Sequence, residues 1–488
     1  MTSLSGHLYQ QTSARSFPLI QTAFAFGVFL IPFNGFQTLS AFGEFQAEMA
    51  FLIFLPLVIV SLPTLRPLRS PLMLLFVAIV AAIGLSTMAN LEQILSASLR
   101  DRSGVNKLVT SMITVIFMFA FAFTVERRLR EPGAFVQQIF KPVFYVTLFL
   151  LVMSVFQVAS WHSGGVAAVY NKIIAVLRTR YEEQWDAGRI DTVSFEPSIL
   201  ALFLTFSLVL MLGLRPLQAR QQRMFTTFCV IPAVLGVLLF GGARTGLLSV
   251  FAILAFHLMF AMVLRRKLPP SLTIVASGGL FLAIHLAVVA NESAVISFIL
   301  AGDSVSNLSR FAAIIASFNI FLTSPVFGAG LGQYAFRALH LMPSWGWLSP
   351  EVVVQFYNPF PSWPPNHSLP MRIASELGSI GVVAYFGILS GFGIAVANKA
   401  KHEQRRLGAY PVVGHTLLLA YVFILFSGIA FDSFRQFTVW MSIAAMAAYI
   451  RYREPETLLT GRVPALYPGV RRLATRDRED SALGGARP

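Results

Sequence analysis

Residues 325–332 read Pro-Val-Phe-Gly-Ala-Gly-Leu-Gly, and residues 364–368 read Pro-Pro-Asn-His-Ser. A polar loop rich in aromatic residues and proline joins these two segments, and a new apolar run follows the second. Most of the remaining chain consists of apolar runs. Because a histidine, His367, lies where the loop re-enters apolar sequence, we interpret the whole chain from the stretch between Pro325 and Gly381.

The composition indicates a membrane protein. Of the 488 residues, 56% are hydrophobic and 12% are charged, whereas about a quarter of the residues in a soluble domain are charged. Apolar runs of ~20 residues, the length that crosses a bilayer as a helix, recur along the chain. We therefore predict an all-α, polytopic membrane helix bundle with about twelve transmembrane helices and a large outer loop that contains short helices.

The apolar windows mark the candidate spans. They lie near residues 17–36, 45–63, 71–89, 108–125, 139–160, 195–214, 225–241, 243–264, 271–290, 367–394, 412–430 and 434–450. The short loops on one side of this pattern are basic, as cytoplasmic loops are. An even number of spans puts both termini on that side, and the long loops 90–107, 161–194 and 291–366 on the other.

Several other classes of protein are disfavoured. The net charge of +15 would suggest nucleic acid in a soluble chain, but basic cytoplasmic loops explain it here, so we expect no nucleic-acid partner. The single cysteine, Cys229, excludes an internal disulfide, and no CxxC or HExxH motif suggests a metal. No P-loop motif is present. We expect neither a metal nor a cofactor.

We expect residues 1–453 to form the transmembrane domain. Residues 454–488 lack apolar periodicity and mix Arg, Asp, Pro and Gly, so we expect a disordered cytoplasmic tail. In the outer loops, 161–194 could form an amphipathic surface helix. Residues 309–322 alternate apolar and small polar side chains at helical spacing and predict a further helix.

Four arginines remain at outer span ends after the basic loops are set aside: Arg244, Arg310, Arg372 and Arg435. A charge within a span costs about 2.5–3.5 kcal/mol, so it usually serves a function. A guanidinium makes two parallel bonds to phosphate oxygens, so converging arginines would suit a pyrophosphate. Arg244 follows a tight glycine-rich turn between two spans, where it could instead be a snorkelling interfacial residue.

Simple structural interpretations exist for the other charged candidates. Local ion pairs are available to each arginine: Arg310 with Asp303, Arg372 with Glu376, and Arg435 with Asp432. Glu196 precedes Pro197 at the start of a span, which is ordinary helix-capping sequence. A role for Glu196 in binding substrate hydroxyls is the alternative.

His367 is the candidate catalytic residue. A neutral imidazole near pH 7 is suited to act as general base toward a sugar hydroxyl, although a histidine at a helix start can also be a polar cap. The paired acids that glycoside hydrolysis needs are not evident, since Glu351 is the only acid in the adjoining loop.

Three stretches carry a resemblance to a known family. They are Gly242–Leu248, Arg310 leading to Ser324–Gly330, and Asn366–Leu369 followed by Glu376–Gly381. In these motifs, and in their order and spacing, the sequence resembles the bacterial O-antigen polymerase and O-antigen ligase superfamily. The resemblance covers a family-like core at residues 240–382.

The resemblance implies a metal-independent inner-membrane glycosyltransferase that uses an undecaprenyl-pyrophosphate-linked glycan and has a large periplasmic loop at 291–366. Arg244 and Arg310 would hold the pyrophosphate, and His367 would activate the acceptor hydroxyl. Further candidate substrate contacts are Arg372, Arg435, Glu196 and Asn366. The family often has an amide after the histidine, whereas here Ser368 follows and Asn366 precedes.

The segment Phe195–Ser198 resembles polysaccharide polymerases, which favours a polymerase that adds a lipid-linked glycan to the next repeat unit. The alternative within the superfamily is a ligase that transfers the glycan to lipid A–core. A transporter or flippase of lipid-linked oligosaccharide is the alternative from another class. The expected surroundings are the bacterial inner membrane, with cytoplasmic termini and a periplasmic active site. A chain-length regulator and a flippase are the expected protein partners.

Overall fold

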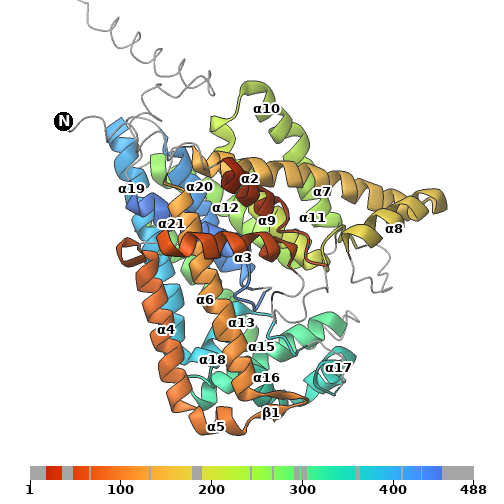
Figure 1. The fold of residues 1–488 in the computed structure, drawn as a ribbon, viewed down its shortest axis with the longest axis vertical. Coiled ribbons are helices and arrows are strands. Elements are labelled where there is room, and N and C mark those ends of the chain that lie inside the picture. The colour runs from red at the N-terminus through yellow and green to blue at the C-terminus, as the bar shows by residue number, and fades with distance from the viewer. Residues whose placement is uncertain are drawn as a thin grey trace, which may run out of the picture. The chain divides into compact units, whose positions relative to one another are not determined.

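The computed structural model describes residues 18–35, 45, 48–64, 67–130, 133–178, 189–241, 244–265, 269–290, 297, 305–357, 363–407, 410–429 and 431–452. The predicted disordered tail, 454–488, lies outside the described residues. The described part is almost wholly helical (Figure 1). Its strands are β1 (Ser98–Leu99) and β2 (Arg102–Ser103), which pair antiparallel.

The predicted membrane helices are present. Seven described helical segments are long and apolar enough to cross a membrane: Leu72–Ala89, Gly104–Arg128, Phe135–Ser160, Pro197–Leu217, Arg220–Phe240, Gly246–Val263 and Leu369–Arg406. Shorter apolar helices include Leu19–Phe29, Met49–Ser61, Ser271–His285, Val412–Ser427 and Phe437–Arg451. Each predicted window overlaps one of these helices, and the all-α polytopic class is confirmed.

The chain divides into two compact units. The first comprises Met1–Leu65, Phe123–Leu247 and Tyr452–Pro488. Its helices are α2 (Pro18–Phe29), α3 (Met49–Ser61), α7 (Lys141–Ser160), α8 (Gly164–Leu177), α9 (Pro197–Leu214), α10 (Arg220–Phe225) and α11 (Ile231–Phe240). Helix α9 is apolar and buried along most of its length, as expected for a helix surrounded by others. Helix α8 is the helix predicted in the loop 161–194.

The second unit comprises Arg66–Ala122 and Leu248–Arg451. Its helices are α4 (Leu72–Ala89), α5 (Leu91–Ser96), α13 (Pro270–Ala290), α15 (Val305–Thr323), α16 (Tyr334–Leu341), α17 (Pro350–Tyr357), α18 (Leu369–Val382), α19 (Ile388–Leu407), α20 (Val412–Ser427) and α21 (Phe437–Arg451). The unit boundaries fall within α6 (Gly104–Arg128) and α12 (Arg244–Arg265). Within the second unit, α19 contacts α13, α20 and α21, and α18 contacts α4 and α15.

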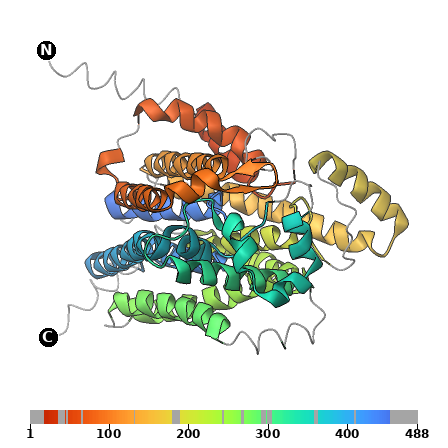
Figure 2. The same ribbon diagram turned by 90° about the horizontal axis from the view of Figure 1, so that it is seen from below.

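Short helices gather at one end of α4 and α6 in the second unit (Figures 1 and 2). There α15, which is the helix predicted at 309–322, packs against α16, α17 and α18. Their shared apolar core includes Ala312, Ala316, Ile320, Tyr334, Phe336 and Phe356. Trp345, Trp347 and Trp363 pack against this core, so the aromatic residues of the loop hold the short helices together.

The glycine-rich segment at residues 325–332 packs against a break in α18. Gly378 has φ 64° and ψ −164° inside the helix, a conformation that glycine adopts without steric cost. The carbonyl of Ser375 there accepts a bond from the N–H of Ala329, 2.8 Å away, and the carbonyl of Glu376 accepts one from Gly330 at 2.9 Å. Backbone groups that the break removes from the helix ladder thus bond to the loop.

The close approach requires glycine on both sides of the crossing. A Cβ on Gly328 would lie 2.6 Å from the nitrogen of Gly378, and one on Gly378 would collide with the carbonyl group of Val326. Ser86, a residue of α4, also bonds to this crossing: its Oγ donates to the Glu376 carbonyl at 2.8 Å. Within the predicted span 367–394, α18 thus begins at Leu369 and is broken at Gly378.

Candidate functional site

His367 lies just before α18 and not on it. Its φ of +62° is unusual for a residue with a side chain, and such strain is often found at functional sites. Ser368 occupies the N-cap position of α18, and Pro370 follows in the first turn. The backbone N–H of Leu369 donates to the carbonyls of Gly428 at 2.9 Å and Phe431 at 2.8 Å. The N-cap position of α18 is therefore taken by Ser368 and not by His367.

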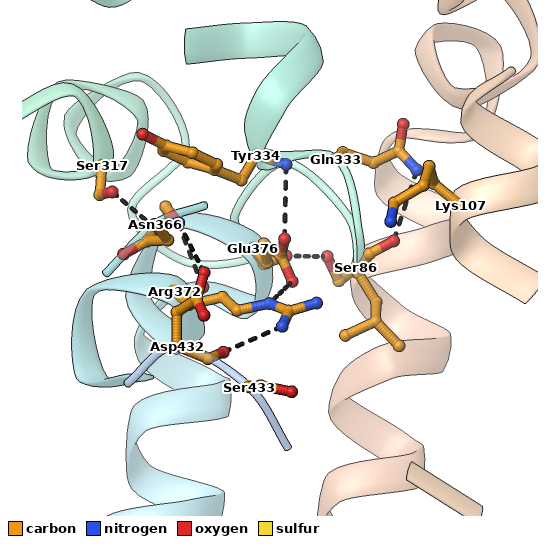
Figure 3. A network of polar contacts seen from close by, with 12 residues as sticks. Ser86, Lys107, Ser317, Gln333, Tyr334, Asn366, Arg372, Glu376, Asp432 and Ser433 are labelled. Atoms are coloured by element: carbon orange, nitrogen blue, oxygen red, sulfur yellow. Dashed lines mark hydrogen bonds and ion pairs between the residues drawn. The ribbon is translucent and has the colours of Figure 1, made fainter. Parts of the chain in front are cut away.

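Asp432 lies in a polar network with Asn366 and Arg372 (Figure 3). It lies between α20 and α21. Its Oδ2 accepts a bond from the backbone N–H of Asn366 at 2.6 Å, and its carbonyl accepts one from Arg372 Nη1 at 2.9 Å. Sequence analysis considered Asp432 only as an ion-pair partner of Arg435. Its position at a span start, where an acid is costly, was the signal that could have identified it.

The charges around Asp432 keep it ionised. Burial acts to raise the pKa of its carboxyl, but Arg372 and His367 oppose this effect, as do the hydrogen bond from Asn366 and the charge of Arg435. The net result is a pKa below the ordinary value. The charges of His367 and Arg435 both act on this carboxylate, so it can stabilise positive charge on either side chain.

Arg372 and Glu376 form the predicted i,i+4 pair on α18, with Nε 3.2 Å from Oε2. Both residues are buried, at 8% and 2% exposure. Arg372 also lies over the ring of Phe434, 5.6 Å from its centroid, and Glu376 Oε1 accepts a long bond of 3.4 Å from the N–H of Tyr334. Since its guanidinium is engaged within the protein, Arg372 links α18 to the segment that carries Asp432.

Asn366 connects the histidine segment to α15. Its Nδ2 donates to Ser317 Oγ at 2.6 Å, and the side chain is almost completely buried. Arg310 lies seven residues before Ser317 on the same helix, hence on the same side and about 10 Å away along the axis. The Arg310 Nε atom is buried without a hydrogen-bond partner among the described residues. Asp303, its predicted ion-pair partner, lies outside the described residues.

The first turn of α6 supports the segment that leads to His367. The ammonium of Lys107, a buried residue, lies 4.7 Å from the ring centroid of Trp363, and the Arg102 guanidinium lies 5.6 Å from it. Gln333, just after the glycine stretch, donates to the Gly104 carbonyl at 2.8 Å. Sequence analysis did not identify these contacts, because nothing in the sequence places α6 beside this loop.

The remaining candidates are Arg435, whose charge also acts on Asp432, and two residues of the first unit, Glu196 and Arg244. The backbone N–H of Arg435 donates to Ser433 Oγ at 3.2 Å. Glu196 occupies the predicted N-cap position of α9 but makes no capping bond, and it accepts a bond from the Ser198 hydroxyl instead. Arg244 begins α12, but its side chain lies outside the described residues.

The apolar helices, which are long enough to span a bilayer, define a multi-pass membrane protein. The buried polar network of Asn366, Arg372 and Asp432 is the candidate active site in its second unit (Figure 3). Residues 228–386 match the family model described as O-antigen ligase. This match includes all three quoted motifs and supports the resemblance of this part of the chain to the O-antigen ligase and polymerase superfamily. A comparison with curated proteins gave no significant match.

The family match supports a membrane glycosyltransferase activity of the O-antigen ligase or polymerase type. Within the second unit, the structure brings together the predicted residues Asn366, His367 and Arg372, and it adds Asp432 and Ser317. The predicted roles of these residues toward a substrate remain predictions.

Proposed function

We propose that this protein transfers a glycan from a polyprenyl pyrophosphate to a sugar hydroxyl at the periplasmic face of the bacterial inner membrane. The observation that carries the proposal is the position of His367 in a strained conformation beside the ionised Asp432. The match to the O-antigen ligase family supplies the class of reaction. The basic loops on the opposite side support cytoplasmic termini.

In this mechanism neutral His367 accepts the proton of the acceptor hydroxyl as its oxygen attacks the anomeric carbon of the donor. The bond from that carbon to the pyrophosphate oxygen breaks, and the lipid pyrophosphate leaves. The imidazolium that forms is stabilised by the Asp432 carboxylate, as an acid stabilises the histidine of a catalytic triad. Arg310 and Arg244 would bind the charge that develops on the leaving pyrophosphate.

The acceptor separates the two candidate reactions. The segment Phe195–Ser198 favours a polymerase, for which the acceptor is the next lipid-linked repeat unit. The family description names a ligase, for which the acceptor is lipid A–core, but the match does not distinguish the two reactions. We propose the polymerase, with the ligase as the second candidate. A flippase and a chain-length regulator are then natural partners.

Deletion of the gene followed by electrophoresis of surface glycans tests this choice. A polymerase deletion should leave surface glycans with a single repeat unit. A ligase deletion should leave bare core and accumulated lipid-linked polymer, and this pattern would contradict the polymerase.

A reaction with purified components separates an enzyme from a transporter. Protein in nanodiscs, supplied with lipid-linked repeat units, should lengthen the glycan without ATP or a proton gradient. A flippase would move the lipid between the leaflets of vesicles without changing the length of the glycan. Transport without extension would therefore contradict the proposed enzyme.

A further inference from the structure

Its neighbours hold the side-chain amide of Asn366 in one orientation. The hydroxyl of Ser317 donates to the carbonyl of Ala313, 2.6 Å away in the same helix. With its proton used there, Ser317 Oγ offers a lone pair to Asn366, so the amide atom that faces it at 2.6 Å is the nitrogen Nδ2. The main-chain N–H of Asn366 is fixed as well, by its bond to Asp432.

In this orientation the side-chain oxygen of Asn366, Oδ1, has no hydrogen-bond donor among the described residues. The residue is also almost completely buried, at 1% exposure. Buried side-chain acceptors in proteins are nearly always bonded. A fixed and unbonded acceptor next to a candidate general base therefore indicates a donor that arrives with the substrate.

We propose that Asn366 is a substrate-contact residue whose Oδ1 accepts a hydrogen bond from a hydroxyl or acylamino N–H group of the glycan. This inference rests on the proposed function and specifies which kind of group the site recognises. A carbonyl oxygen has no proton to donate, so it binds O–H and N–H groups and does not bind ionised phosphate oxygens.

The same geometry predicts how the bound substrate is oriented along α15. Arg310 presents an unbonded buried donor atom, Nε, which suits an anion, and Asn366 at Ser317 presents an unbonded acceptor. These two helix positions are about 10 Å apart along the axis, a distance on the scale of one sugar joined to a pyrophosphate. The pyrophosphate then lies toward Arg310, and the sugar nearest to it lies toward Asn366 and His367.

Substrate analogues test the contact directly. Purified protein in nanodiscs is supplied with the native lipid-linked repeat unit or with analogues that each lack one donor group. In a deoxy analogue a hydroxyl is replaced by hydrogen, and in an acyloxy analogue an acylamino N–H is replaced by oxygen. We expect one analogue to lower kcat/KM of the wild type about 10- to 100-fold, since it leaves Oδ1 buried without a partner.

Asn366→Ala should lose a similar factor with the full substrate and no further factor with that one analogue. Imperfect folding of a variant lowers kcat/KM for all substrates alike. The ratio of kcat/KM between the full substrate and an analogue, taken within one variant, is therefore unaffected by it. Ser317→Ala is the graded control: it keeps Oδ1 but removes the bond that orients the amide, so it should discriminate against the same analogue less than the wild type does and more than Asn366→Ala does. The identity of that analogue decides between a hydroxyl and an acylamino group.

Two results would overturn the inference in different ways. If Asn366→Ala discriminates among the analogues as strongly as the wild type does, Asn366 is only a structural link between α15 and Asp432. If the wild type neither binds nor transfers the full lipid-linked substrate, the proposed function itself fails and the inference fails with it.

Discussion

Each unit contains an arginine that bonds a carboxylate. The two networks around these pairs differ in whether their side-chain amide is fully hydrogen-bonded. In the first unit, Arg178 bonds Asp191 at 2.8 Å. Gln157 donates to Asp191 and to the Arg189 carbonyl and accepts bonds from the N–H groups of Asp191 and Thr192. The amide of Gln157 is thus fully bonded within the protein.

In the second unit, Arg372 bonds both Glu376 and the Asp432 carbonyl, but the network ends in an acceptor that is not used, Oδ1 of Asn366. Beside it lies His367 in a left-handed conformation. A buried polar network with all groups bonded adds rigidity, whereas an incomplete one costs stability and is retained where a ligand completes it. The difference lies in the two amides, because Thr192 Oγ1 in the first network is also buried without a partner among the described residues. It is consistent with Gln157 holding loops together and with the proposed contact of Asn366 to a substrate.

Substitution of the histidine tests the second network most strongly. We expect His367→Ala to lower the rate of glycan transfer about 10²- to 10⁴-fold, the usual contribution of a general base. Donor binding and the melting temperature in nanodiscs should stay close to those of the wild type, because the side chain lies before α18. Full-length polymer in cells that carry this variant would refute the assignment of the base.

A matched pair of arginine variants compares the two networks. Arg372→Met should cost about 3–5 kcal/mol of unfolding free energy, because it leaves a buried carboxylate unpaired, and it should also abolish most transfer by displacing Asp432. Arg178→Met should cost less, about 1–2 kcal/mol, since this ion pair is partly exposed.

The readouts are thermal unfolding in nanodiscs and the transfer rate of the fraction that remains folded. Arg178→Met should retain most of that specific activity. If it loses as much specific activity as Arg372→Met, the first network is not merely structural and the comparison is wrong.

Arg244 tests whether the first unit also contributes to substrate binding, because it belongs to that unit. If Arg244 holds the pyrophosphate, Arg244→Ala should weaken donor binding about 10- to 100-fold, the loss expected for a charge-assisted bond to phosphate. Arg244→Lys, which keeps the charge but loses the bidentate fork, should give an intermediate affinity. Unchanged donor binding in both variants would return Arg244 to the role of an interfacial residue.

The smallest expected effect is a pH dependence that Asp432 adds to stability. Its pKa in the folded protein lies below the ordinary value, so the carboxylate stabilises the fold above the ordinary pKa of an aspartate. That contribution is lost as the pH falls through the lowered folded pKa. Asp432→Asn should therefore be less stable than the wild type at pH 7, and the difference should shrink toward pH 3 in thermal unfolding experiments. A difference that does not change with pH would show that the charge is not responsible.

The sequence alone determined the class of protein, because hydrophobic runs long enough to cross a bilayer leave few alternatives. It also identified His367, Arg310 and Arg372 as candidates, since charges in apolar surroundings are costly and usually serve a function. The three family motifs identified the superfamily, which the match at residues 228–386 confirmed.

Only the tertiary structure decided how these residues meet. Asp432 lies 65 residues after His367 and Ser317 lies 50 before it, and no periodicity relates such distant positions. The break at Gly378 was also not predictable, because it depends on a second segment, at Gly328, that bonds the freed backbone groups. Local sequence sets the cost of each buried polar group, but the long-range fold supplies the partner that offsets it.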